Sequence, residues 1–222
     1  MQKFNTPAAI TAVLDVPAGR IQVIAADRAD TTVEIRPANA SKGRDVKAAD
    51  RTTVEYVDGV LRITAPADGN QILGASGSVE VTVRLPAGSH LEAKAAAAGF
   101  RGVGRLGDIT FEGAHGTVRI DEAASVRLAL QAGDVTIGRL TGPAEISTHQ
   151  GDILIAEASS GTVVLRTRAG DVTVGAAHGV GACLDAGTGH GRIDNTLRNT
   201  DGAAVLDIHA TTDHGDITAH SL

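Results

Sequence analysis

Gly151-Asp152-Ile153-Leu154-Ile155 is one copy of a short phrase that recurs through the second half of the chain. Glycine permits a corner with a positive φ, and the short aspartate side chain can accept a hydrogen bond from a backbone N–H group there. The aliphatic residues that follow the aspartate lie two positions apart, which places them on one face of a strand. Further copies begin at Gly107, Gly133, Gly170 and Gly215, and variants of the frame begin at Gly116, Gly161 and Gly191.

The spacing of these glycines predicts a stacked repeat. Successive Gly-Asp pairs lie 26, 18, 19 and 45 residues apart, and Gly191 divides the last interval into 21 and 24 residues. Intervening turns at Gly116, Gly142, Gly161 and Gly179 indicate a unit of about 9–10 residues, so that two units make a rung of about 18–20 residues. We therefore predict an all-β fold, a β-solenoid-like stack of short Gly-Asp-Val/Ile repeats over residues 89–222, with rungs about 4.8 Å apart.

The composition fits such a stack. Aromatic residues make up only 2% of the chain, whereas hydrophobic residues make up 42%, so aliphatic side chains must fill the interior. The positions expected to point inward are Val118, Ile120, Val135, Ile137, Ile153, Ile155, Val163, Leu165, Val172 and Val174.

Residues 1–88 predict a different set of strands. Alternating or β-prone segments cover residues 8–16, 20–25, 31–36 and 78–85, and the runs 53–57 and 60–64 flank Asp58-Gly59, a strong hairpin signal. Residues 38–50 and 66–77 are predicted as loops, and residues 95–98 as strand or loop. We expect residues 1–88 to form antiparallel strands that cap the solenoid and are continuous with it as one structural unit. The other end, near His214–Leu222, has no evident cap, so we expect a partner or a second copy to cover it.

Charge and cysteine content exclude several classes of protein. The net charge is −6, and residues 151–222 carry nine acidic and four basic residues. Without a basic patch or stacking aromatics, nucleic acid is not an expected partner. Cys183 is the only cysteine, so no internal disulfide is expected. The first 25 residues show no leader, and no apolar run approaches the roughly 20 residues that span a bilayer, so we expect a soluble cytoplasmic protein without membrane insertion.

The repeated aspartates are the first candidate site. Stacked in register, their carboxylates would form a ladder along one corner, where repulsion raises their pKa values and a cation such as Ca²⁺ could bind. The glycine-rich nonapeptide of calcium-binding β-rolls is absent. We therefore interpret them as solvated residues that cap turns: Asp108, Asp134, Asp152, Asp171 and Asp216.

Histidine and cysteine give two further candidates. Four histidines precede a glycine, namely His115, His178, His190 and His214, and His149 lies two residues before Gly151. Aligned imidazoles could bind Zn²⁺ or sense pH, but no close metal-binding spacing occurs, so we interpret them as exposed turn residues. His209 is expected to be packed or exposed at an edge, and Cys183 to be a small buried thiol.

An enzymatic alternative rests on a small charged group. Arg166 and Arg168 could face Asp152 and Asp171 on neighbouring rungs, as basic and acidic residues do in β-helix enzymes that act on polysaccharides. The aromatics that would stack on sugar rings are absent, so we interpret the group as a solvated, salt-bridged face. We predict no catalytic, cofactor-binding or metal-binding residues.

The Gly-Asp-Ile/Val phrases, the intervening Gly-Thr-Val strands and the segment Leu85-Pro86-Ala87-Gly88 followed by Leu91 carry a family resemblance. They resemble a bacterial β-strand-repeat family catalogued as "putative adhesin", domain of unknown function 4097. The resemblance implies an all-β, solenoid-like fold without assigned catalytic residues, and some members are linked to envelope stress signalling.

For function we carry three hypotheses. The first is a non-catalytic protein-binding or scaffold module that uses a long flat β face, adhesin-like or linked to envelope stress, with self-association through the solenoid end as one form of binding. The second is a carbohydrate-active or metal-dependent enzyme on a β-helix frame. The third is a surface adhesin, which would require export.

Overall fold

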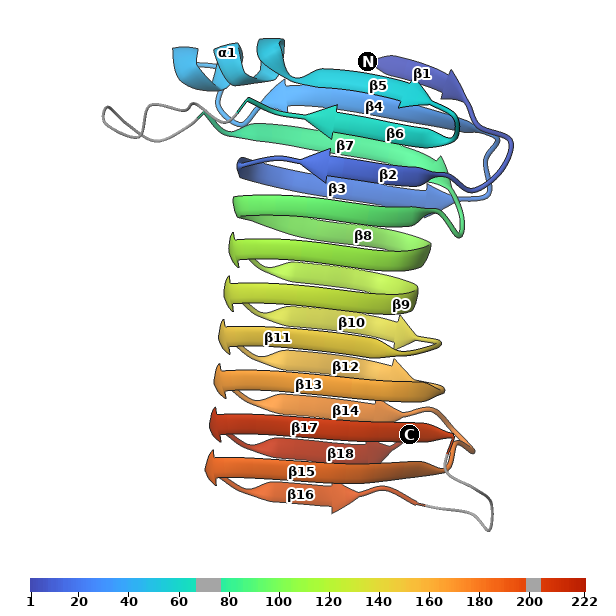
Figure 1. The fold of residues 1–222 in the computed structure, drawn as a ribbon, viewed down its shortest axis with the longest axis vertical. Coiled ribbons are helices and arrows are strands. Elements are labelled where there is room, and N and C mark those ends of the chain that lie inside the picture. Colours follow the sequence, from blue (N-terminus) through green and yellow to red (C-terminus); the bar gives the residue numbers. More distant parts are fainter. Residues whose placement is uncertain (67–76, 199–204) are drawn as a thin grey trace. The chain divides into compact units, whose positions relative to one another are not determined.

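The computed structural model describes residues 1–66, 77–198 and 205–222, and strands dominate it (Figure 1). The all-β, solenoid-like fold predicted from the repeats is confirmed. The chain separates into two compact units, Met1–Gly116 and Thr117–Leu222. The division at residue 88 stays a prediction, as does the capping role of residues 1–88.

The first unit contains the strands expected from alternation. The hairpin over residues 53–64 is confirmed, with antiparallel strands joined by Asp58 at φ 50° and Gly59 at φ 79°. The run over residues 95–98 lies within a strand. The elements are β1 (Gln2–Asn5), β2 (Thr11–Asp15), β3 (Ala18–Ala26), β4 (Asp30–Pro37), α1 (Gly43–Arg51), β5 (Thr53–Val57), β6 (Val60–Thr64), β7 (Val79–Pro86) and β8 (His90–His115).

Strand pairing in this unit is mixed. Among the described residues, β1–β4, β4–β7 and β5–β6 are antiparallel, as predicted for the N-terminal strands. In contrast, β2 and β3 pair in parallel with β6, β7 and β8. The prediction of antiparallel strands over residues 1–88 is therefore wrong for β2 and β3, and parallel stacking already begins at the second strand. Phe100 and Phe111, both on β8, pack inside with ring centroids 5.5 Å apart.

The predicted loop over residues 38–50 is wrong in part, because residues 43–51 form α1. The helix packs with Asp45 and Ala48 buried, and a carboxylate oxygen of Asp45 accepts the Ser78 N–H at 3.1 Å. The buried face of α1 consists of Asp45 and Ala48, three residues apart, so it presents a charged residue and a methyl group instead of the large apolar residues by which a helical period is recognised. The other predicted loop, residues 66–77, falls largely on residues 67–76, which lie outside the described residues.

The second unit is a stack of two-stranded rungs in register. Strands of one layer pair in parallel with their equivalents in the next rung, for example Val135 with Ile153 and Ile137 with Ile155. The long strand β9 supplies both layers of its rung, because its first half pairs with β10 and its second half with β11. The elements are β9 (Val118–Ala132), β10 (Val135–Leu140), β11 (Ala144–Gln150), β12 (Ile153–Ala158), β13 (Gly161–Ala169), β14 (Val172–Ala176), β15 (Ala182–His190), β16 (Ile193–Thr196), β17 (Leu206–His214) and β18 (Ile217–Ser221).

The predicted inward positions are confirmed as the core of this unit. All ten branched aliphatic residues named from the sequence are at most 2% exposed. They fill the space between the two layers of each rung with branched aliphatic side chains, which pack well on a pleated surface.

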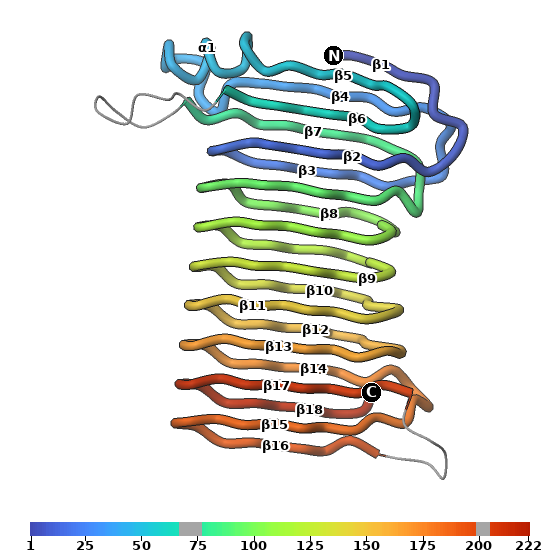
Figure 2. The backbone as a smooth tube through the Cα atoms, in the orientation of Figure 1, coloured from blue at the N-terminus to red at the C-terminus, as the bar shows by residue number. Residues whose placement is uncertain are grey.

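The order of the last two rungs differs from the order of the sequence. Strands β17 and β18 lie between the rung of β13 and β14 and the rung of β15 and β16 (Figures 1 and 2). The prediction that the stack ends near His214–Leu222 is therefore wrong, and the terminal rung is β15–β16. The inserted rung is the more apolar one at matched inward positions: it has Leu206 and Ala219 inside, where the terminal rung has Ala182 and Asn195.

Corner glycines set the approach of neighbouring rungs. Gly170 has φ 148° and Gly215 has φ 150°. A Cβ atom on Gly170 would overlap the carbonyl oxygen of Gly151, and one on Gly215 would overlap that of Gly170. Both the backbone conformation and the contact therefore exclude a side chain at this corner.

We expect Gly170→Ala to lower the free energy of unfolding by about 2–4 kcal/mol, because it adds backbone strain and a steric overlap. Gly187→Ala is the matched control, since Gly187 lies in β15 without a positive φ, and a Cβ atom added there would meet nothing within 4 Å. Urea denaturation of both variants measures the difference. Equal stability of the two would contradict the assigned role of the corner.

Candidate functional site

The repeated aspartates form a hydrogen-bonded ladder along one corner of the second unit. The Asp152 N–H donates to Asp134 Oδ1 at 3.1 Å, and the Asp171 N–H donates to Asp152 Oδ1 at 2.8 Å. The ladder continues from the Asp216 N–H to Asp171 Oδ1 and from the Arg192 N–H to Asp216 Oδ1, both at 2.8 Å. The capping interpretation is confirmed for Asp134, Asp152, Asp171 and Asp216, and each of these carboxylates caps the neighbouring rung rather than its own turn.

Asp108 has a different partner in the first unit. Its backbone N–H donates to His90 Nδ1 at 3.1 Å, and its Oδ2 lies 3.2 Å from the same nitrogen. Gly107 lies inside β8 without the positive φ of Gly133, Gly151, Gly170 and Gly215, so this copy of the phrase differs from the others both in its backbone and in pairing its carboxylate with an imidazole.

Arg192 closes the ladder at the terminal rung. Its Nη2 lies 3.3 Å from Asp216 Oδ2. The Arg192 backbone N–H, and then its guanidinium, hold the pKa of the Asp216 carboxyl below its usual value. Across the described ranges, no group of three or more His, Cys, Asp or Glu side chains is placed to hold a metal ion.

A threonine ladder runs inside the same corner, and the sequence reasoning missed it. The Oγ1 atoms of Thr167 and Thr212 donate to the carbonyl oxygens of Gly151 and Gly170 at 3.1 and 3.0 Å. Thr188 donates to the Gly215 carbonyl at 3.0 Å. The signal was present, because each of these threonines lies three residues before its own corner glycine.

The histidines occupy the positions expected of turn residues. His115, His149, His178, His190 and His214 are exposed. The rings of His190 and His214 stack with centroids 4.8 Å apart, because the two residues are register partners on β15 and β17. Parallel rings direct their nitrogen lone pairs alongside one another rather than toward one point, which does not suit a shared metal ion.

His209 projects outward from β17 and is partly exposed. Its Nδ1 lies 3.3 Å from Asp185 Oδ2, and its Nε2 lies 3.4 Å from Asp207 Oδ2. The imidazole thus bridges two carboxylates on the surface of the last two rungs.

The prediction of a buried Cys183 thiol is wrong, because the residue is exposed. Ala182 and Leu184 take the inward positions of β15, so Cys183 faces outward opposite Asp207. Asp185 lies two residues after Cys183 and therefore on the same face of the strand, so this alternation could have indicated that Cys183 faces outward.

The predicted charged group also does not assemble. Arg166 lies on β13 between Ser147 and Thr211. In the described parts of the chain, neither Arg166 nor Arg168 forms an ion pair with Asp152 or Asp171, whose carboxylates belong to the corner ladder.

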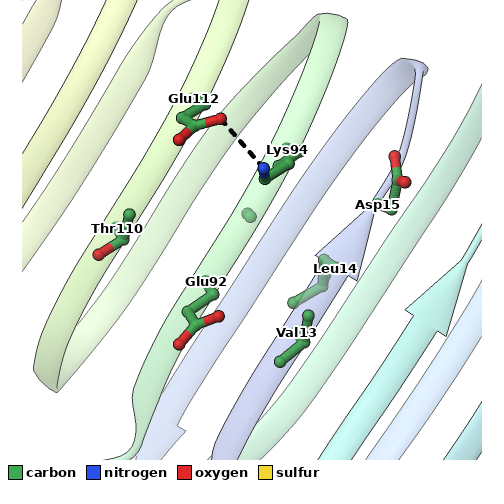
Figure 3. Close-up of a pocket in the computed structure, with 8 residues that line it drawn as sticks. Val13, Leu14, Asp15, Glu92, Lys94, Thr110 and Glu112 are labelled. Carbon is green, nitrogen blue, oxygen red and sulfur yellow. Dashed lines mark ion pairs between the residues drawn. The ribbon is translucent and has the colours of Figure 1, made fainter.

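The first unit has a shallow open depression of about 330 Å³ on the outer face of β2 and β8 (Figure 3). Lys94 Nζ lies 3.2 Å from Glu112 Oε2, and Asp15 and Glu92 are also at its border. These are alternating outward side chains of a regular sheet, and exposed ion pairs of this kind contribute little binding or stability.

The terminal rung leaves a sheet edge open. β15 pairs with β17 on one side and β16 pairs with β18 on one side, and no strand among the described residues pairs with the opposite edges. Inward residues lose their cover there: Ile193 is 46% exposed, whereas its register partner Ile217 is 1% exposed. In the described parts of the chain, this edge therefore combines strands that no further strand joins with an exposed apolar side chain, Ile193.

Comparison with known families assigns most of the chain to one family. The family model described as Toastrack DUF4097 matches residues 13–220. The chain belongs to this family. The resemblance inferred from the Gly-Asp phrases is therefore confirmed.

Solved structures give further similarities to this Toastrack chain. A "putative cell adhesion protein" from Clostridium sporogenes is 14% identical, with 100% of this chain and 98% of that chain covered and a TM-score of 0.43. A "putative adhesin" from Bacteroides fragilis and a "putative lipid binding protein" from Parabacteroides distasonis are each 12% identical, with 98% and 95% of the two chains covered and TM-scores of 0.46 and 0.47. No curated protein matches the chain. In the described ranges, no helix has the length and apolar character to cross a bilayer.

We expect Asp171→Ala to lower the melting temperature of the Toastrack chain by about 2–4 °C, because the Asp216 N–H loses its acceptor. Asp171→Asn keeps a side-chain oxygen and removes one negative charge from the column, so it should retain the wild-type melting temperature. Thermal unfolding followed by circular dichroism measures both. If Asp171→Asn lowered the melting temperature more than Asp171→Ala does, the negative charge and not the hydrogen bond would be what stabilises the corner.

The lowered pKa of Asp216 makes its contribution dependent on pH. A carboxyl with a lowered native pKa stabilises the fold above its unfolded pKa, and the stabilisation is lost as the pH falls through the native value. Asp216→Asn should therefore unfold at a lower temperature than wild type at pH 7, with the gap closing below pH about 4. When Arg192→Gln is also present, Asp216→Asn should lower the unfolding temperature at pH 7 by less, because the guanidinium that pairs with the Asp216 carboxylate is already gone. A gap that does not change with pH would contradict this role of the carboxylate.

Proposed function

We propose that this Toastrack chain is a non-catalytic protein-binding module that engages another protein through the open edge of β15–β16. The observation that carries the proposal is the terminal rung, which has no pairing strand among the described residues and exposes Ile193. Solenoids generally need a cap on such an end, because an open edge is a template for another strand.

The rest of the described surface supports binding at this edge rather than chemistry. The corner aspartates and threonines are engaged in hydrogen bonds between rungs, and the outer depression is open and crossed by an ion pair. The flat outer face of β10, β12, β14 and β18 presents mainly small and hydroxyl side chains in register, with Leu154 at 38% exposure. An adhesin-like role or a link to envelope stress would use the same edge as its contact.

The test compares two variants in capture from the source cells at native expression level. We expect a stoichiometric protein partner, identified by mass spectrometry and reconstituted from purified components, to bind wild type and Leu154→Ser but not Ala186→Pro. Proline at residue 186 places its ring at the edge of β15 and removes a donor there. A partner lost by Leu154→Ser and kept by Ala186→Pro would assign binding to the flat face and overturn the proposal.

A further inference from the structure

We propose that the segment which binds this edge is an extended strand with small apolar residues at inward positions and lysine or arginine at outward positions. This inference rests on the proposed function and specifies the chemistry of the partner. Strand addition of this kind takes affinity from backbone hydrogen bonds and specificity from alternate side chains.

The backbone of β15 is arranged for such addition. The ladder to β17 begins with the Leu206 N–H, which donates to the Gly181 carbonyl at 3.2 Å. Because a parallel ladder uses alternate residues of each strand, the groups of Cys183, Asp185 and Gly187 face β17. The N–H and C=O groups of Leu184 and Ala186 therefore point toward the open edge.

The inward side of the edge calls for apolar residues. Leu184 and Ala186 are half-buried, whereas their register partners Ile208 and Ala210 on β17 are completely buried. An added strand would supply the missing layer over these side chains and over Ile193 on β16, which holds the inward register position of Ile217. Small branched residues suit this space, because every other rung of the unit fills it with valine, isoleucine, leucine or alanine.

The outward side of the edge is acidic. Asp185 and Asp194 project from β15 and β16, and Asp207 and Asp213 lie one strand further in. Two arginines lie nearby: Arg192 is paired with Asp216 at the corner, and Arg198 follows β16. His209 lies between Asp185 and Asp207.

A basic residue opposite Asp185 would complete a cross-strand pair of opposite charge, which stabilises a sheet. A second copy of this chain would instead bring the same carboxylates to the interface. The charges of the edge therefore favour a basic strand over a second copy.

The probe is a ten-residue peptide that alternates valine with lysine, and its matched control alternates valine with glutamate. We expect the lysine peptide to bind the full chain in fluorescence anisotropy and the glutamate peptide to bind at least about tenfold more weakly. Ala186→Pro should abolish binding, Asp185→Asn should weaken it about threefold to fivefold, and Leu154→Ser should leave it unchanged. Alkylation of Cys183, the only thiol, should slow when the peptide is bound.

Two results would overturn the inference. Equal binding of the two peptides would remove the charge preference, and equal binding of the lysine peptide to wild type and Ala186→Pro would show attraction to the acidic surface in general. If Ala186→Pro does not fold, Ala186→Lys replaces it, because an inward-pointing charge also blocks an edge.

Other outcomes separate this inference from the proposed function. A reconstituted partner that depends on residue 186, together with no binding of either peptide, would leave the proposed function standing and reject the basic strand. Dimers of wild type in light scattering that Ala186→Pro abolishes would make a second copy the occupant and likewise reject it. No partner and no peptide binding would reject both.

Discussion

The close approach of neighbouring rungs at the glycine corner is the constraint on which the second unit depends. At Gly170 and Gly215 each backbone passes so near the carbonyl oxygen of the adjacent rung that no Cβ atom fits. This contact keeps equivalent residues opposite one another from rung to rung, because a shift by one residue would bring a side chain into the corner. The in-register core of valine and isoleucine follows from that alignment.

The same corner explains why residues that look chemically active are structural. Register brings each aspartate beside the N–H of its equivalent in the next rung and each inner threonine beside a glycine carbonyl. Polar groups held in this way satisfy the backbone where the chain turns between the two layers, so they replace the bonds that a sheet ladder provides elsewhere. A periodic polar residue in a solenoid is therefore first a candidate for holding the corner.

The repeat period of the sequence predicts the structural features that recur from rung to rung, and it gives no information about features that occur only once. Glycine spacing and alternation gave the rungs, the inward residues, the hairpin at Asp58-Gly59 and the aspartate ladder. Alternation also places Cys183 outside, although its usual preference for burial pointed the other way. The order of the last two rungs could not be read, because β15 and β17 fit the same register and local pattern does not choose between them. The short helix α1 escaped prediction because its buried face carries Asp45 and Ala48 and no large apolar residue.

Burial explains the choice of order for these rungs. Placing β17 and β18 inside covers Leu206, Ile208 and Ile217 on both sides, whereas the sequential order would leave these side chains at the open end. The rung left outside has Ala182 and Asn195 at inward positions and glycine at residues 187 and 189. Burying the more apolar rung is favourable by the area it removes from water. It also leaves a terminal edge with an acidic outer surface, which limits non-specific pairing while its backbone stays available to a strand of opposite charge.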